Sequence, residues 1–233
     1  AGRLPAHPGT PLMTAVVLAG ALAAVTARAG GGDAFWDVKR RGANFFNRTE
    51  TDERFRAAAE AGIAWVRLVP DKWKGAGRDF LLGDAGRYAG LVPADLAKLK
   101  RALDWADARS VKVVVGMLSL PGARWNQLNG KKPDLRLYRE TGYQDQAVRF
   151  WGDLSRALRG HPAVVAYNVV NEPHPDRHKP SKGFDLDAFY TRVVAAIREA
   201  DPDTFVMLDG GDYASVGGLS RLRPPPDPRI LYA

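Results

Sequence analysis

Short apolar runs alternate with longer amphipathic segments along most of the chain. The apolar runs predict strands at residues 38–46, 63–69, 111–118, 164–171, 204–208 and from 230 onward. Apolar residues at helical spacing predict helices at residues 51–61, 93–106, 143–159 and 186–200. In the second of these helices, Leu96, Leu99 and Leu103 share one face. The uninterrupted run Val113-Val114-Val115 is typical of a strand buried on both faces, as in a parallel sheet.

The order of these elements predicts βαβ units and an α/β fold with a parallel sheet. An open doubly wound sheet and a TIM (β/α)8 barrel are the two candidates. The open sheet usually carries a glycine-rich phosphate-binding turn, but neither G-x-G-x-x-G after the first strand nor G-x-x-x-x-G-K-[ST] occurs in this sequence. Polar residues lie at the C-terminal ends of several strands instead, at Asn44, Arg67 and Asn171-Glu172, as in a barrel that builds its site on one rim. We therefore predict an incomplete TIM barrel with about six strands present.

Residues 12–27 form an uncharged run rich in Ala, Val and Leu. Arg3 precedes the run, and Ala27-Arg28-Ala29 places small residues where a signal peptidase requires them, which is the pattern of a secretory signal. The run is shorter than the ~20 residues that a membrane-spanning helix needs. An N-terminal helix packed in the core and an uncleaved membrane anchor are the alternatives. We predict a signal peptide at residues 1–29 and a secreted protein, extracellular or periplasmic, with no membrane attachment after cleavage.

Composition narrows the class of protein. Of the 233 residues, 45% are hydrophobic and 26% are charged, which excludes disordered and collagen-like chains. The absence of cysteine excludes disulfides, thiolate metal sites and cysteine nucleophiles. The net charge of +8 would suit a nucleic-acid partner, but the basic residues are spread along the chain and alternate with acidic ones. We therefore expect no nucleic-acid partner. We also expect a monomer.

The strongest chemical signal is Asn171-Glu172-Pro173, directly after the fourth apolar run. A carboxylate at such a strand end is held on a rigid element and partly shielded from water, which suits a general acid. Asn171 beside it can bind a sugar hydroxyl. A strand-end turn with a surface glutamate is the alternative, and the place after the fourth strand favours catalysis.

Arg67 lies near the C-terminal end of the second predicted strand. A cation there is costly unless a carboxylate pairs with it, so we expect a second catalytic carboxylate as its partner. Two carboxyl groups about 5 Å apart on one rim form the arrangement of retaining glycosidases. A purely structural ion pair is the alternative role for Arg67.

These residues resemble glycoside hydrolase family 5, the cellulase family, which carries Asn-Glu-Pro on strand four. The resemblance extends over nearly the whole chain after residue 29 and rests on Arg41-Gly42-Ala43-Asn44-Phe45-Phe46, Val66-Arg67-Leu68, Leu120-Pro121-Gly122 and Tyr167-Asn168-Val169-Val170-Asn171-Glu172-Pro173-His174. It implies that Glu172 is the acid/base, that Asn171 binds the sugar next to the cleaved bond and that Arg67 supports the nucleophile. The implied substrates are β-linked glucans and mannans, and we expect no cofactor.

The sequence departs from the family pattern in two ways. Many members carry His on strand three, three residues before Pro-Gly, where this chain has Leu118. The family's nucleophile is a Glu at the end of strand seven, and an aromatic platform follows on strand eight; neither strand is expected within these 233 residues. We therefore interpret residues 30–233 as the N-terminal three-quarters of a glycoside hydrolase barrel, name no nucleophile, and expect this fragment alone to be inactive.

Aromatic and histidine side chains near the strand ends are candidates for sugar contacts. Trp73 follows the second strand and Trp125 the third, and sugar rings stack on such faces through their C–H groups. A loop anchor is the alternative for each tryptophan. His174 either contacts substrate or bonds within its own loop. A metal site from His174, Asp176 and His178 fits by spacing, but their loop lacks a rigid frame, so we expect no metal.

These features together predict a secreted retaining glycosidase that hydrolyses O-glycosidic bonds of a β-linked polysaccharide. Its partner would be a polysaccharide or oligosaccharide, and its activity that of a cellulase, a β-glucanase or a mannanase. A carbohydrate-binding barrel without catalysis is the alternative, which would keep the aromatic loops but needs no acid at Glu172. A nucleotide-binding open-sheet protein would need the glycine turn that is absent from this sequence.

Overall fold

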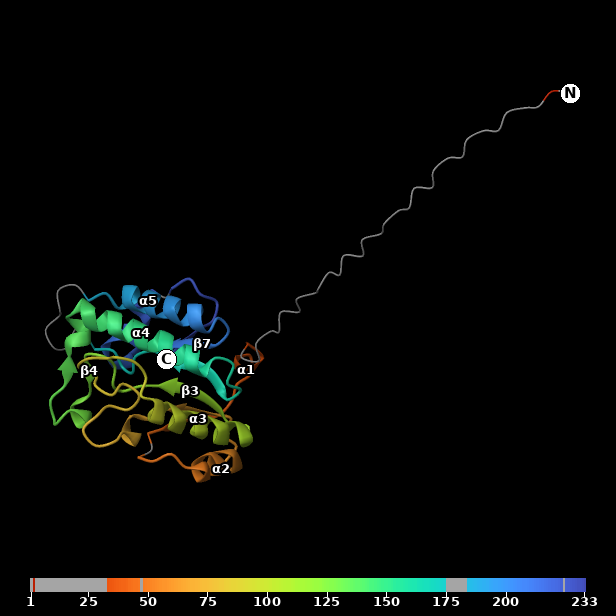
Figure 1. Ribbon diagram of the computed structural model, residues 1–233, viewed down its shortest axis with the longest axis horizontal. Coiled ribbons are helices and arrows are strands. Elements are labelled where there is room, and N and C mark those ends of the chain that lie inside the picture. The colour runs from red at the N-terminus through yellow and green to blue at the C-terminus, as the bar shows by residue number, and fades with distance from the viewer. Residues whose placement is uncertain (1, 3–32, 47, 175–183, 224) are drawn as a thin grey trace.

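A parallel sheet forms the centre of the protein (Figure 1). The computed structural model describes residue 2 and residues 33–46, 48–174, 184–223 and 225–233. Within these residues the main sheet has the order β1-β2-β3-β6-β7-β8, and all neighbouring strands are parallel. Its strands are β1 Gly42–Phe45, β2 Trp65–Leu68, β3 Lys112–Gly116, β6 Val164–Asn168, β7 Phe205–Leu208 and β8 Ile230–Tyr232. The predicted strands are confirmed, although most are shorter than predicted.

Four long helices of the described chain alternate with these strands. They are α2 Asp52–Glu60, α3 Pro93–Ala108, α4 Thr141–Leu158 and α5 Leu186–Ala200, which confirms the predicted helices. Local sequence explains two of their starts. Pro93 stands in the first turn of α3, and the Asp185 side chain caps α5 by accepting a hydrogen bond from Ala188 N–H at 3.0 Å.

Shorter elements lie before the first strand and in the connections. They are the helices α1 Asp33–Trp36, α6 Gly211–Ala214 and α7 Val216–Arg221, the 3-10 turns η1 Asp71–Trp73, η2 Asn126–Leu128 and η3 Arg136–Tyr138, and the antiparallel pair β4 Ala123–Arg124 and β5 Asp134–Leu135. The elements β4, η2, β5 and η3 all lie between β3 and α4 in the sequence. The segment between β3 and α4 is therefore a structured loop.

The four long helices all pack on one face of the sheet. Alternate strand residues, such as Val66, Val113 and Val206, form one hydrophobic core with helix residues such as Leu103 and Phe150. Because the sheet curves, α2 and α3 lie below the strands in Figure 1 and α4 and α5 above them. A doubly wound sheet carries helices on both faces. The single helical layer is instead that of a barrel wall, which confirms the predicted choice between the two architectures.

The opposite face of the sheet is the inner face of this wall. A small apolar cluster occupies its lower part and consists of Phe35, Val114, Val165, Ala166, Phe205 and Met207. The short helix α1 places Trp36 edge-on against Trp65 there, with ring centroids 5.5 Å apart. Arg67 and Asn168 lie on the same inner face, because their strand neighbours Val66 and Tyr167 point into the helix-covered core. The inner face thus changes from apolar to polar toward the strand ends.

The sheet is not closed within the described residues. β1 pairs only with β2, and β8 pairs only with β7. Side chains of β1 are correspondingly half-buried or exposed, whereas those of β6 and β7 are buried. The architecture is an incomplete α/β barrel, as predicted.

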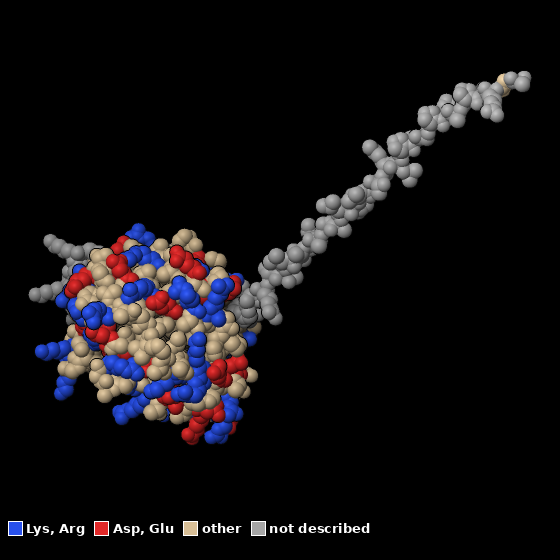
Figure 2. All heavy atoms as spheres, in the orientation of Figure 1, with Lys and Arg blue, Asp and Glu red and all other residues tan. Residues whose placement is uncertain are grey.

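Three findings bear on the predicted location and partners. No helix in the described part of the chain is long and apolar enough to cross a membrane. The predicted signal peptide at residues 1–29 lies outside the described residues, apart from Gly2. Figure 2 shows basic and acidic side chains interspersed over the visible face of the folded part, as they are in the sequence.

Candidate active site

Glu172 lies at the C-terminal rim of the barrel wall, in the bend that follows β6. The predicted strand at 164–171 was too long, because β6 ends at Asn168 and the chain turns before Asn171. Glu172 has an exposed side chain and a φ of 49°. This left-handed backbone costs a residue other than glycine roughly 1–2 kcal/mol. Contacts around the bend must therefore hold Glu172 in place.

Arg67 links β2 to this bend. Its Nε donates to Asn168 Oδ1 at 2.8 Å, and its Nη2 donates to Asn171 Oδ1 at 2.7 Å. Burial lowers the pKa of the guanidinium, and the negative charges of Asp209 and Glu172 oppose this effect. The sequence predicts a carboxylate partner for Arg67, but no carboxylate is found among its described hydrogen bonds. The hydrogen bonds of Arg67 go to two neutral amides instead.

Asp209 joins the same network from the neighbouring strand. It follows β7 directly and is 4% exposed. Its Oδ1 accepts from Asn168 Nδ2 at 2.7 Å, and its Oδ2 accepts from the backbone N–H of Glu172 at 2.9 Å. Burial raises the pKa of Asp209, although these two bonds and the charge of Arg67 favour the ionised form. The sequence alone does not single out Asp209, although a polar residue at the end of a strand was a signal that could have found it.

An open depression of about 220 Å³ lies beside Glu172. Its wall is formed by Phe46, Lys72, Leu118, Trp125, Gln127, Asn171 and Glu172. These residues follow β1, β2, β3 and β6, so the depression lies on the rim where a barrel builds its site. A second, more apolar cavity shares Leu118, Trp125 and Asn171 with the depression and extends to Tyr138 and His174.

The two tryptophans that we predict as sugar platforms occupy different places. Trp125 is half-buried and lines the depression, so part of its indole is available to a ligand. Trp73 is 4% exposed and packs edge-on against Phe80, with ring centroids 5.7 Å apart. The structure corrects the expectation for Trp73. This residue anchors its loop in the core because the turn η1 directs its ring inward, and it does not line the depression.

His174 bonds within its own loop. It is 7% exposed, and its Nδ1 lies 2.9 Å from the carbonyl oxygen of Glu172. Its ring stacks on Tyr213, with centroids 4.6 Å apart and planes 5° apart, and lies 4.9 Å from the ring of Trp125. His174 thus supports both the bend at Glu172 and the indole at the depression, whereas direct contact with substrate stays a prediction.

The turn that carries Tyr213 has an uncommon backbone. Asp212, Tyr213 and Ala214 have φ values of 55°, 59° and 56°. Each left-handed residue costs roughly 1–2 kcal/mol. The turn is held by hydrogen bonds from Tyr213 N–H to Pro173 O and from Ala214 N–H to Gly210 O, both at 3.1 Å. Strain of this kind next to a candidate site is typical of functional segments.

A buried carboxylate holds the backbone of Leu118 at the depression. Asp71 is 2% exposed, and its two oxygens accept from Leu118 N–H at 2.9 Å and Ser119 N–H at 2.6 Å. Burial raises the pKa of Asp71 to about 6, although both backbone bonds favour its charge. Leu118 occupies the place where the resemblance leads us to expect His, and its apolar side chain lines both cavities.

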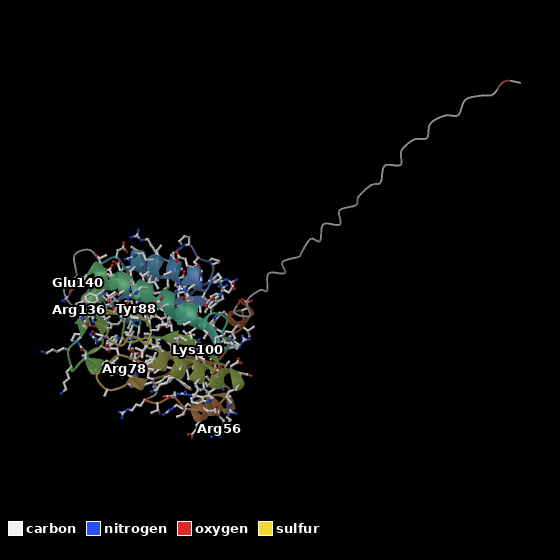
Figure 3. All side chains as sticks on the ribbon, viewed as in Figure 1. Arg56, Arg78, Tyr88, Lys100, Arg136 and Glu140 are labelled. Carbon is white, nitrogen blue, oxygen red and sulfur yellow. The ribbon has the colours of Figure 1, made fainter. Side chains whose placement is uncertain are left out.

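Ion pairs fix the loop that carries Trp125. The adjacent Arg124 donates to Asp79 at 2.8 Å and to Asp134 at 3.1 Å. Arg136, labelled in Figure 3, donates to the same Asp134 at 2.7 Å. Burial raises the pKa of Asp134, but the hydrogen bonds from Arg136 outweigh this effect and hold the pKa below its usual value. Trp125 is thus presented by a cross-linked loop.

A metal centre has no support in the described part of the chain, where no group of three or more His, Asp or Glu side chains could hold an ion. Of the set that fits by spacing, Asp176 and His178 lie outside the described residues.

The arrangement suits acid–base chemistry on a bound carbohydrate. Glu172 offers a carboxyl group to the depression from a backbone that is held at both its N–H and its C=O. Arg67 occupies Oδ1 of Asn171, so the Nδ2 group is the part of this amide that can donate to a ligand. Trp125 adds an apolar face on which a sugar ring can stack.

Comparison with known proteins gives a match over most of the chain. The model of the family described as "Cellulase (glycosyl hydrolase family 5)" matches residues 32–233. The solved structure of Pseudomonas stutzeri endoglucanase Cel5A in complex with cellobiose is similar, with a TM-score of 0.61 and 21% identity over 83% of this chain and 58% of that chain. Endo-glycoceramidase II from Rhodococcus sp. has a TM-score of 0.59 and 20% identity over 83% of this chain and 55% of that one. These structures confirm the fold.

Sequence relatives include several glycosidases. A β-xylosidase from Phanerodontia chrysosporium is 29% identical over 128 residues, which are 54% of this chain and 26% of the relative. The "Probable glucan 1,3-beta-glucosidase A" of Emericella nidulans is 26% identical over 174 residues, 74% of this chain and 40% of the relative. Endoglucanase C of Acetivibrio thermocellus is 24% identical over 189 residues, 80% of this chain and 50% of the relative. The chain thus spans half or less of the length of these relatives.

Proposed function

Because the chain belongs to the cellulase family, glycosyl hydrolase family 5, we propose that the protein is a retaining glycosidase that hydrolyses O-glycosidic bonds of a β-linked polysaccharide. Its partner is then a polysaccharide or oligosaccharide. The relatives named endoglucanase and glucan 1,3-beta-glucosidase support a β-glucan as the substrate.

Glu172 is the proposed acid/base. In the retaining reaction, a carboxylic acid protonates the leaving glycosidic oxygen while a second carboxylate attacks the anomeric carbon. The first group then takes a proton from the water that hydrolyses the glycosyl-enzyme. The observation that carries this proposal is the geometry of Glu172, whose backbone is held by Asp209 and His174 while its side chain faces the depression.

Four further residues have proposed roles in binding. Trp125 is the sugar platform, because it is half-buried and lines the depression beside Glu172. Asn171 binds the sugar next to the cleaved bond through its Nδ2 group. Arg67 orients Asn171 and supports the second carboxylate, since it keeps a positive charge on the inner face. His174 is the fourth residue proposed for binding, and its ring lies 4.9 Å from that of Trp125.

We assign no residue of this chain as the nucleophile. Asp209 does not fit that role, because it is 4% exposed and both of its oxygens accept hydrogen bonds, one from Asn168 and one from Glu172. The nucleophile is proposed to lie outside residues 1–233, and this chain alone is proposed to be inactive.

Export is part of the proposal and is supported by the uncharged run at residues 12–27. N-terminal sequencing of the exported protein should find Gly30 as its first residue. An exported or membrane-held protein that still begins within residues 1–29 would contradict the proposed cleavage.

Affinity labelling tests the role of Glu172 without requiring turnover. N-bromoacetyl β-cellobiosylamine places its amide nitrogen where the glycosidic oxygen of a β-glucan would lie, and its alkylating carbon two bonds further on, within reach of the proposed acid/base. We expect peptide mapping by mass spectrometry to find the adduct on Glu172. Cellobiose should protect against labelling, and Glu172→Gln should abolish it. Glu199→Gln, which changes an exposed glutamate on α5, is the matched control and should leave labelling unchanged.

The same experiment separates the enzyme from the alternatives. Saturable cellobiose binding without alkylation of Glu172 would favour a carbohydrate-binding barrel without catalysis, and no saturable binding would refute the proposed function. The chain alone should release no sugar from β-glucan. Release that disappears in Glu172→Ala would show instead that the chain contains its own nucleophile.

A further inference from the structure

We propose that Asp209 is a positioning residue, which fixes Glu172 through a closed ring of hydrogen bonds. The ring joins Arg67 on β2, Asn168 on β6 and Asp209 after β7 to the bend at Asn171-Glu172. The inference rests on the proposed role of Glu172 as acid/base. Asp209 itself does not face the depression, so it acts through the backbone of Glu172 and not on the substrate.

Every bond of the ring has a defined direction. Arg67 can only donate, and it donates to both Asn168 Oδ1 and Asn171 Oδ1. The amide of Asn168 must therefore turn its Nδ2 toward Asp209, where the distance to Oδ1 is 2.7 Å. The other oxygen of Asp209 accepts the N–H of Glu172 at 2.9 Å. Since Asn171 and Glu172 are consecutive, these bonds close the ring.

Only an ionised carboxylate satisfies this place in the ring. Asp209 meets two donors, Asn168 Nδ2 and Glu172 N–H, and each requires an acceptor. An asparagine at position 209 has one acceptor oxygen, so its NH2 group would face a donor. Turning the amide of Asn168 cannot repair this mismatch, because it would present Nδ2 to the Arg67 guanidinium. The positive charge of Arg67 compensates the carboxylate in this buried place.

The ring matters for chemistry because Glu172 has a left-handed backbone. Without the bond from its N–H to Asp209, the bend can relax toward the negative φ that residues other than glycine prefer. Such a relaxation would swing the Glu172 side chain relative to Trp125 and the bound sugar. A displacement of about 1 Å at a reacting group can lower a rate by roughly 100-fold.

Two readouts on the whole chain test the proposal with the variant Asp209→Asn. The first is hydrogen exchange of the Glu172 amide, which should become at least about tenfold faster, because a charge-assisted bond is lost. The second is the rate of Glu172 alkylation by N-bromoacetyl β-cellobiosylamine at saturation. We expect this rate to fall by about 10- to 100-fold while the cellobiose dissociation constant changes by less than about threefold.

Asp201→Asn is the matched control. Asp201 is also buried, at 2% exposure, and accepts hydrogen bonds from Tyr167 at 2.8 Å and Thr204 at 2.7 Å near the opposite end of β7. This variant should lower the melting temperature without changing Glu172 exchange or alkylation. The comparison removes any effect that comes only from the loss of a buried carboxylate.

The double variant Asn168→Asp with Asp209→Asn is the rescue. It exchanges the amide and the carboxylate, so position 168 still accepts from Arg67, position 209 donates to it, and an oxygen remains for Glu172 N–H. The longer bond from Asn168 Nδ2 to Met207 O, at 3.3 Å, lies outside the ring and is lost in this variant. We expect it to restore slow exchange of the Glu172 amide. We also expect its alkylation rate to be at least about tenfold higher than that of Asp209→Asn. The single variant Asn168→Asp should show neither effect, because two carboxylates would then face each other.

The outcomes separate the positioning role from the proposed function. If Asp209→Asn destabilises the chain like Asp201→Asn but leaves Glu172 exchange and alkylation unchanged, Asp209 is merely structural and the proposal fails. If the double variant behaves like the worse single variant, the directed ring is wrong. If wild-type Glu172 is never alkylated, the proposed function fails, while the exchange data still decide whether Asp209 holds Glu172.

Discussion

Replacing Asp71 with asparagine should change how the stability of the protein depends on pH. The Asp71 carboxyl is 2% exposed, and it accepts hydrogen bonds from the backbone of Leu118 and Ser119. Burial raises its pKa to about 6, which means that these bonds do not fully offset the loss of hydration. The native state therefore binds a proton at Asp71 under conditions in which the unfolded chain has released it.

The size and sign of the effect follow from linkage. An unfolded aspartate has a pKa of about 3.9, and each pH unit between the two values is worth about 1.4 kcal/mol. Because the folded pKa is the higher one, the contribution of Asp71 is most favourable below pH ~4 and is lost as the pH rises to about 6. The loss is about 3 kcal/mol. Asp71→Asn cannot titrate and lacks this dependence.

Urea unfolding followed by tryptophan fluorescence between pH 4 and pH 7 measures the difference. We expect the free energy of unfolding of the wild type, relative to Asp71→Asn, to be greatest at pH 4 and about 2 kcal/mol smaller at pH 7, because part of the full effect already occurs below pH 4. Other titrating groups are common to both proteins and cancel in the difference. Lys72→Gln is the control, since it alters an exposed charge in the same turn. A stability difference between the wild type and Asp71→Asn that is constant across this range would refute the argument that burial dominates at Asp71.

Three further predictions concern the rim. Trp125→Ala should weaken cello-oligosaccharide binding by about tenfold in calorimetric titration, because a stacking face is lost. Trp73→Phe should instead lower the melting temperature and leave the affinity unchanged, and equal losses of affinity in the two variants would place both rings in the site. Ala214→Gly removes a Cβ from a left-handed residue and should stabilise the protein by up to about 1 kcal/mol, and a lower melting temperature would contradict this backbone. Gly218→Ala should destabilise the protein by about 3 kcal/mol or more, because the added Cβ would overlap the carbonyl oxygen of Gly211; a wild-type melting curve would show that the segment packs differently.

Periodicity predicts much of the fold. Runs such as 111–118 and amphipathic segments such as 186–200 became a strand and a helix, because a short uninterrupted apolar run suits a strand buried on both faces and apolar residues that recur every 3.6 positions suit a helix. The strand boundaries were less accurate, for example at the start of β1 and at the end of β6. Val169 and Val170 are buried and apolar like the strand before them, so nothing in their residue types marks the bend that places Glu172.

The candidate site was predictable only in part. The sequence indicates Glu172, Asn171 and Arg67, because each lies near the C-terminal end of an apolar run, on a rim that parallel strands share. It does not reveal that Arg67 bonds to amides, or that Asp209 is the carboxylate behind Glu172. These partners lie on different strands, and their contact depends on register.

The sequence by itself determined the alternation of strands and helices, the rim on which polar residues gather, and the resemblance that identifies Glu172. The tertiary structure decided which tryptophan faces the depression. Both residues are of the same type and follow a strand, but the ring of Trp73 is buried in the core whereas that of Trp125 lines the depression. The tertiary structure also decided how Glu172 is held. The hydrogen-bond ring joins residues on or directly after β2, β6 and β7, so it forms only when these strands come together in the sheet. The spacing of its residues along the chain does not predict it.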